Sequence, residues 1–238
     1  VEDLLPLTLT WTLTYDLPDR DPLKVEGKQR IAPVQPLNVP RAKRPPILDG
    51  RLDEWKTLPY RWDKPGQILP RADSWKGPED CSFRFAAACD DSALYLAVEA
   101  IDDQQVYGRG LEERQDGIRL RLDARPEPER SQGRNRKDEA LVVALSAGET
   151  MGQPGSESDR KGPEGVRAIC RPTATGHVTE IAVPAGYLGA RQGGPWSAVR
   201  LNLGVSDYDR EGAGIVTWWR PEWGTDENIA GTGTFLRK

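Results

Sequence analysis

Apolar and polar residues alternate in short segments along most of this chain, and no window sustains a 3.6-residue apolar period for three turns. Side chains of a β-strand point to alternate faces, so a period of two indicates strands, whereas helices need the longer period. The alternation is strictest over residues 5–15, where leucine, tryptophan and tyrosine occupy every odd position. Further alternating or short apolar segments lie at 83–87, 94–101, 118–122, 140–145, 166–170, 178–183, 199–205, 215–219 and 232–236.

Turn-forming residues separate these segments. The 238-residue chain holds 24 glycines and 20 prolines, which favours frequent chain reversals. Short strands with turns between them predict an all-β protein, an antiparallel β-sandwich of jelly-roll-like form. A single helical turn is expected near residues 184–188, with Pro184 at its first position.

The domain organisation follows from the distribution of proline. Residues 16–22 read as a turn, and the proline-rich residues 31–46 should be extended. We therefore expect an N-terminal strand and a proline-rich linker or strap over residues 1–45, and one β-sandwich domain over residues 46–238. The first strand either ends a preceding module or pairs with the main sheet. Two charged loops rich in glycine and proline are expected at 125–138 and 148–165.

Several classes of function are disfavoured by composition. The net charge of −4 provides no basic field for nucleic acid. No run of 18 apolar residues could span a membrane. With one histidine, no Ser-His-Asp or Cys-His catalytic arrangement is expected, and no glycine-rich phosphate loop or CxxC metal motif occurs. We therefore expect no enzymatic activity. The chain begins at valine without a signal peptide, which indicates a mature or excised piece.

The three cysteines do not define a disulfide framework. Cys81 and Cys89 flank one expected strand, which would separate their Cα atoms by roughly 26 Å, against a bridging limit of about 7 Å. Those two therefore do not pair. Cys170 either pairs with one of them or all three are buried free thiols.

Six segments, in order, resemble the family 9 carbohydrate-binding modules. They are residues 46–55 (PILDGRLDEW), 91–103 (DSALYLAVEAIDD), 116–123 (DGIRLRLD), 180–184 (EIAVP), 201–209 (LNLGVSDYD), and Trp218 or Trp219 followed by 231–235 (GTGTF). The resemblance implies a jelly-roll-like sandwich of the DOMON-like superfamily. It also implies non-catalytic binding of an oligo- or polysaccharide, as one module of a larger extracellular or periplasmic protein.

Aromatic residues are the first candidates for the ligand site. Sugars stack their apolar faces on aromatic rings, and the resembled family binds its sugar between two aromatic walls. Trp75 lies in a polar loop, and Trp218, Trp219 and Trp223 cluster near the C-terminus. Adjacent residues of a strand point to opposite faces, so one of Trp218 and Trp219 should be core and the other exposed. The alternative for all four is structural packing, which we also expect of Trp55, Trp62 and Trp196.

Polar candidates accompany these rings. Arg119 and Arg121 share the face opposite Ile118, Leu120 and Leu122, where their guanidinium groups could bind sugar hydroxyls. The alternative is a solvated outer face. Gln115 and Asn202 are further candidates of the same kind.

Acidic pairs raise the question of a metal. The resembled family often carries structural calcium, and Ca²⁺ takes six to eight oxygen ligands. Asp102, Asp103, Asp207 and Asp209 are the candidate ligands, although ordinary turn capping explains such pairs equally.

Two alternative functions stay open. One is a structural or protein-interaction module without sugar binding. The other is haem binding, which some DOMON-type domains achieve with a methionine and a histidine, here Met151 and His177. Facing, solvent-accessible indoles would favour sugar binding, whereas buried indoles would favour the structural module.

Overall fold

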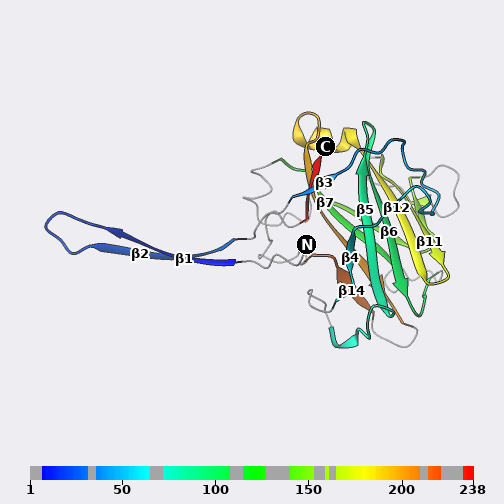
Figure 1. Ribbon diagram of the computed structural model, residues 1–238, viewed down its shortest axis with the longest axis horizontal. Helices are drawn as coiled ribbons and strands as arrows, with labels where there is room; N and C mark the ends of the chain where they lie inside the picture. Colours follow the sequence, from blue (N-terminus) through cyan, green and yellow to red (C-terminus); the bar gives the residue numbers. More distant parts are fainter. Residues whose placement is uncertain are drawn as a thin grey trace.

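The protein is a sandwich of two β-sheets from which one hairpin projects (Figure 1). The computed structural model describes residues 7–31, 36–64, 72–107, 115–126, 140–152, 159–160, 165–209, 214–220 and 233–238. Most strand pairs are antiparallel, so the predicted all-β antiparallel sandwich is confirmed.

The first layer is a seven-stranded sheet whose central strands are long. Its order is β10 (Asp159–Arg160), β9 (Thr150–Met151), β11 (Arg167–Thr173), β12 (Gly176–Pro184), β6 (Ala93–Asp102), β5 (Cys81–Cys89) and β4 (Tyr60–Trp62). Among the described strands of this sheet, β10 and β9 pair in parallel and the other pairs are antiparallel.

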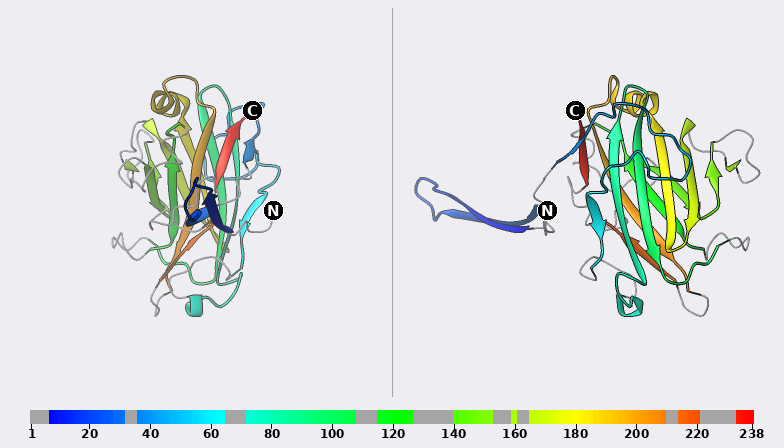
Figure 2. Two further views of the ribbon diagram at one scale, coloured as in Figure 1. Left: turned by 90° about the vertical axis from the view of Figure 1, so that its left-hand side faces the viewer. Right: turned by 45° about the vertical axis from the view of Figure 1, so that its right-hand side comes forward.

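The second layer is a six-stranded sheet built around β13. Its order is β3 (Leu37–Val39), β15 (Thr234–Arg237), β13 (Ala198–Asp207), β7 (Gly117–Asp123) and β8 (Leu141–Ser146), and β14 (Ile215–Trp218) also pairs with β13. In the right-hand view of Figure 2, β14 lies behind the seven-stranded sheet. The proline-rich segment thus supplies an edge strand, because β3 pairs in parallel with β15 and buries Val39.

The alternation of the sequence determines which side chains enter the core. Leu94, Leu96 and Val98 of β6 face the second sheet, where Ile118 and Leu120 of β7 meet the same cluster. Burying apolar side chains between two sheets is the main favourable contribution to such a fold. The core is therefore the space between the layers.

The outer face of the seven-stranded sheet is covered in its middle by residues 48–55. Leu48 and Trp55 pack on Ala93, Tyr95 and Ala182. The buried carboxylate of Glu180 anchors this segment, because it accepts hydrogen bonds from the backbone N–H groups of residues 49 and 50, at 3.0 and 2.9 Å, and from the Trp55 indole at 3.2 Å.

One helix, α2 (Ala185–Gln192), follows β12. It is longer than the predicted single turn, and Pro184 stands before it rather than at its first position. A short 3-10 helix, η1 (Ala72–Ser74), lies in the loop before β5. No helix among the described residues is long and apolar enough to cross a membrane.

The N-terminal residues form a hairpin of β1 (Leu7–Tyr15) and β2 (Leu23–Ile31). The turn at 16–22 lies where the sequence predicts it, but β2 was not predicted. Its apolar positions Leu23 and Val25 are followed by Gly27, which interrupts the alternation.

All three cysteines are buried free thiols. Cys81 and Cys89 lie at the two ends of β5, as the predicted strand requires. Of the two alternatives for Cys170, the free thiol is confirmed.

Candidate functional site

Strand ends bring a set of carboxylates together at one end of the sandwich. Asp102 ends β6, Asp207 ends β13, and Asp116 directly precedes β7. Antiparallel neighbours begin and end at the same edge, as the pairs Cys81↔Asp102 and Gly117↔Ser206 show. The carboxylates therefore come from both sheets and meet between them.

Asp102, Asp116 and Asp207 form an inner trio. One carboxylate oxygen of each lies within 4.8 Å of the others, and all three residues are buried. The Asp116 carboxylate accepts hydrogen bonds from the backbone N–H groups of Tyr208, at 2.7 Å, and of Val106. Asp102 accepts the backbone N–H of Gln104 at 2.7 Å. The loops that follow the strands thus orient two of the three carboxylates.

Two oxygens of this inner trio are buried without a hydrogen bond from the described residues: Asp102 Oδ2 and Asp207 Oδ1. A buried polar atom without a hydrogen-bond partner lowers the stability of the fold, so a bound ion or water at these oxygens would be stabilising. Burial raises the pKa of Asp116 and of Asp207 to about 8, and it also raises the pKa of Asp102. Neighbouring carboxylates add to the shift of Asp207 because like charges disfavour ionisation.

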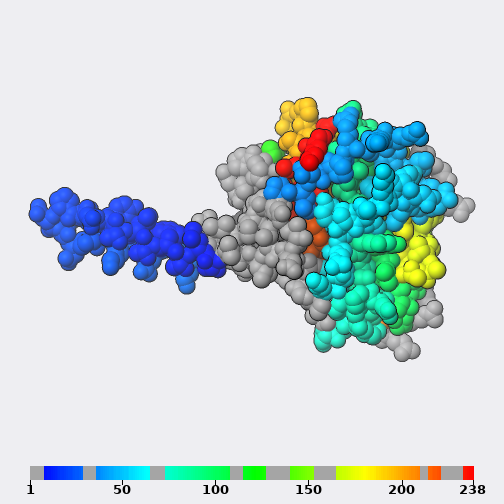
Figure 3. Space-filling view, viewed as in Figure 1, coloured from blue at the N-terminus to red at the C-terminus, as the bar shows by residue number. Residues whose placement is uncertain are grey.

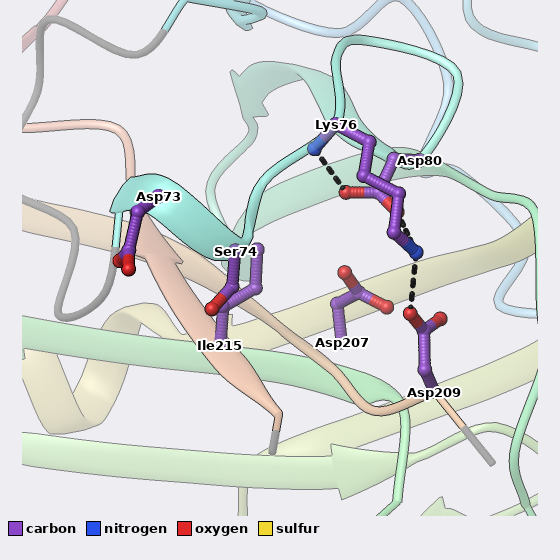
Figure 4. A pocket seen from close by; sticks show the side chains of 7 residues that line it. All are labelled: Asp73, Ser74, Lys76, Asp80, Asp207, Asp209 and Ile215. Carbon is purple, nitrogen blue, oxygen red and sulfur yellow. Dashed lines mark hydrogen bonds and ion pairs between the residues drawn. The ribbon is translucent and has the colours of Figure 1, made fainter. Parts of the chain in front are cut away.

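Asp80, Asp103 and Asp209 form an outer trio next to it. Lys76 neutralises part of this group, with its Nζ atom 2.8 Å from Asp209 Oδ2 and 3.4 Å from Asp80 Oδ1 (Figure 4). These hydrogen bonds, first of all that with Asp209, raise the pKa of Lys76. The chain therefore supplies its own cation to the outer trio, whereas the described residues give the inner trio no such ion pair.

A hollow of about 330 Å³ opens beside the two trios. Figure 4 shows Lys76 between Asp80 and Asp209, with Asp207 beside Asp209. Its further lining residues are Asp73, Ser74 and Ile215. Four of its seven lining residues are aspartates, and carboxylate oxygens of this kind suit a hydrated cation.

The donor set fits calcium. Ca²⁺ is a hard cation that prefers carboxylate and carbonyl oxygens, and the inner trio offers two oxygens with no other partner. Of the four predicted metal ligands, Asp102 and Asp207 belong to the inner trio and Asp103 and Asp209 to the outer one. Sequence reasoning missed Asp116 and Asp80. Asp116 opens the segment 116–123 that carries the family resemblance, and this was the available signal.

A second candidate site lies on the outer face of the six-stranded sheet. Arg119 donates from Nε to Ser206 Oγ at 2.8 Å. The Arg121 guanidinium lies over the Trp218 ring, 4.9 Å from its centroid. Gly204 allows this arrangement, because a Cβ there would lie 2.9 Å from the Trp218 ring and closer still to the backbone oxygen of Thr217. Three predicted ligand residues, Arg119, Arg121 and Trp218, therefore share one face.

Trp218 and Trp219 point to opposite faces, as the strand predicts, but both are buried, at 5% and 3% exposed. Trp219 joins the core against Tyr60, Phe85 and Phe235. The expectation that one of the pair is exposed is wrong, since Arg121 covers part of the outward ring. The side chain of Asn202 lies on the same outer face. It donates a hydrogen bond to the carbonyl of residue 220 and accepts one from the backbone N–H of that residue, both at 3.0 Å.

Trp75 is half-buried at the carboxylate end of the sandwich. Its indole donates to the Cys81 carbonyl at 2.7 Å, and its ring meets the edge of Trp62 at 5.5 Å. Among the described residues, its ring contacts are with Trp62 and not with Trp218 or Trp219. Trp223 lies outside the described residues, and Gln115 is half-buried.

The remaining candidates lie in structural positions. Trp62 and Trp196 are buried in the core, and Trp55 belongs to the segment that Glu180 anchors. His177 is 1% exposed, and burial lowers its pKa to about 4. Met151 of β9 pairs with Ala168 of β11, and His177 of β12 pairs with Pro172 of the same strand. The partners of the two residues of the haem alternative are therefore four positions apart along β11.

No protein-family model matches the sequence, and no curated protein does. Among the solved structures that share the fold are two of a family 9 carbohydrate-binding module from Caldicellulosiruptor kristjanssonii. The complex with cellotriose has a TM-score of 0.60 at 13% identity and covers 86% of this chain and 94% of its own. The complex with glucose has a TM-score of 0.59 at 14% identity and covers 86% and 96%.

Proposed function

We propose that this chain is a non-catalytic carbohydrate-binding module whose ligand face is the outer face of the six-stranded sheet. The observation that carries the proposal is the convergence of Arg119, Arg121 and Trp218 on that face. The likeness of its fold to modules solved with cellotriose and glucose supports it. The corresponding setting is a larger extracellular or periplasmic protein with further modules.

The two arginines carry the hydrogen bonding in this proposal. A guanidinium presents planar donors that match vicinal sugar hydroxyls, and an aromatic ring beneath it fixes its orientation. Trp218 is the platform that holds Arg121 in place. A sugar ring reaches the indole itself only when Arg121 swings aside.

Calorimetric titration with glucose and cellotriose tests this proposal. Arg121→Ala should weaken binding by about 10-fold or more, the loss expected for a hydrogen bond to a charged group. Arg84→Ala is the matched control, since Arg84 is exposed on the outer face of the other sheet. Unchanged affinity in Arg121→Ala would place the ligand elsewhere.

A structural or protein-interaction module is the second candidate function. Burial of Trp218 and Trp219 favours it, because a sugar-stacking wall needs an accessible ring. Flat calorimetric traces for glucose, cellotriose and a wider panel of glycans would support this reading against the first.

We propose in addition that the inner trio holds a structural calcium ion. Asp102, Asp116 and Asp207 would be the protein ligands, and the ion would supply positive charge that links the ends of both sheets. The two orphan oxygens support this assignment.

A further inference from the structure

The hairpin carries an apolar face that nothing in the described part of the sandwich covers. We call it the apolar hairpin face. It consists of alternate residues of both strands, in register, as Leu13↔Val25 and Tyr15↔Leu23 show. Its members are Leu9, Trp11, Leu13, Tyr15, Leu23 and Val25.

Every member of the apolar hairpin face is exposed, from 37% for Trp11 to 53% for Leu23. Figure 1 shows the hairpin extending away from both sheets, and the space-filling view in Figure 3 shows it as a separate arm. A lone two-stranded hairpin is at best marginally stable in water. A contiguous apolar face of this kind marks an interaction surface.

The face is flat. Trp11 lies opposite Gly27 in the register, and a Cβ at Gly27 would come within 2.3 Å of its indole. The ring therefore lies across the neighbouring strand instead of standing up from it. A level face suits packing of sheet on sheet, at about 10 Å, rather than insertion of a side chain into a pocket.

The charges lie on the opposite face. Threonines at 8, 10, 12 and 14 share that face with Lys24, Glu26 and Lys28. The apolar hairpin face therefore meets an identical face without burying a charge. A lipid surface fits less well, because the open edges of a two-stranded ribbon would leave backbone N–H and C=O groups unsatisfied in hydrocarbon.

The area is sufficient for a dimer. Six large side chains at these exposures present roughly 600 Å² in each copy, and roughly 1,200 Å² in a pair, which reaches the lower range of specific stable interfaces. A surface that is complementary to itself pairs through a two-fold axis. We propose that the apolar hairpin faces of two copies pack against each other and make this chain a dimer in solution.

Sedimentation analysis of the 238-residue chain, from about 1 μM to about 1 mM, tests the proposal. We expect a species of twice the 26.4 kDa mass of one chain, with a dissociation constant that rises at least 10-fold in Leu13→Lys and in Tyr15→Lys. Thr12→Lys adds the same charge to the opposite face of the same strand and should leave the dimer unchanged.

Two results would overturn the proposal: a monomer throughout the concentration range, or an oligomer that persists unchanged in both face variants. The hairpin takes no part in the sandwich sheets, so far-UV circular dichroism of each variant should retain the β-signal of the sandwich. Glycan binding is measured separately, so either proposal can fail while the other stands.

Discussion

At the scale of single residues, what a side chain can bind depends on its burial and its neighbours as well as on its type. Arg119 and Arg121 are half-buried on the outer face of their sheet, so the predicted face is correct. The contact between Arg121 and Trp218 could not be predicted, because it depends on β14 pairing beside Gly204. The inner trio likewise joins residues from three strand ends, and its grouping depends on how the two sheets pack.

The single histidine gives a direct test of core burial. His177 has its pKa lowered to about 4 from 6.5 because burial disfavours the imidazolium. Between pH 6.5 and pH 4 the unfolded chain therefore binds a proton at this histidine that the folded chain does not bind. The contribution of His177 to the free energy of unfolding is fully present above pH 6.5. It is lost as the pH falls to 4, and the loss amounts to about 3 kcal/mol.

Nuclear magnetic resonance of the imidazole protons measures this shift without assignment, since the chain has one histidine. The folded protein should show no titration near pH 6.5, whereas the urea-unfolded chain should titrate there. A midpoint near 6.5 in the folded protein would show that His177 is accessible to water.

At the scale of elements, alternating and short apolar segments predicted the long strands of the sandwich, whereas the shortest strands were missed. β5, β6, β7, β12 and β13 lie where the sequence predicts them. β3 and β4 have only three residues each, so no pattern can develop, and their pairing depends on distant partners. β9 and β10, two residues each, fall within the predicted 148–165 loop.

The anchoring of residues 48–55 by Glu180 predicts a large effect from one carboxylate. Glu180→Ala should lower the free energy of unfolding by about 2–4 kcal/mol, because two backbone N–H groups and the Trp55 indole lose their acceptor. Urea denaturation measures it.

Glu99→Ala is the matched control, since Glu99 lies on the same face of the neighbouring strand, in an exposed ion pair with Arg84. We expect it to change the free energy of unfolding by less than about 1 kcal/mol. Equal effects in the two variants would contradict the anchoring role of Glu180.

At the scale of the whole molecule, the inner trio lies where strand ends of the two sheets meet. Asp116 and Asp207 have pKa values of about 8, far above the ordinary 3.8. Without a cation, the folded protein keeps these two carboxyls protonated up to about pH 8, whereas in the unfolded chain they ionise near pH 4. The free energy of unfolding is therefore highest below pH 4, as far as these groups determine it, and declines as the pH rises toward 8. A bound calcium ion would remove this penalty by stabilising the ionised carboxylates.

Thermal unfolding with calcium and with a chelator tests this proposal. Calcium at about 100 times its dissociation constant adds about 2.7 kcal/mol, or roughly 5–10 °C in Tm for a chain of this size. The gain should be larger at pH 8 than at pH 5. Asp116→Asn should abolish it, while Asp53→Asn, at an exposed ion pair, should not. A Tm that is indifferent to calcium at both pH values would exclude the site.

The segment that Glu180 anchors has one further consequence. Because residues 48–55 overlay the middle of one sheet, the two sides of the sandwich are not equivalent. A polymer lying along this protein would meet Arg119 and Arg121 only from the side of the six-stranded sheet. In the proposed function, a glycan bound at Arg119 and Arg121 would therefore leave the anchored segment on the side of the sandwich turned away from it.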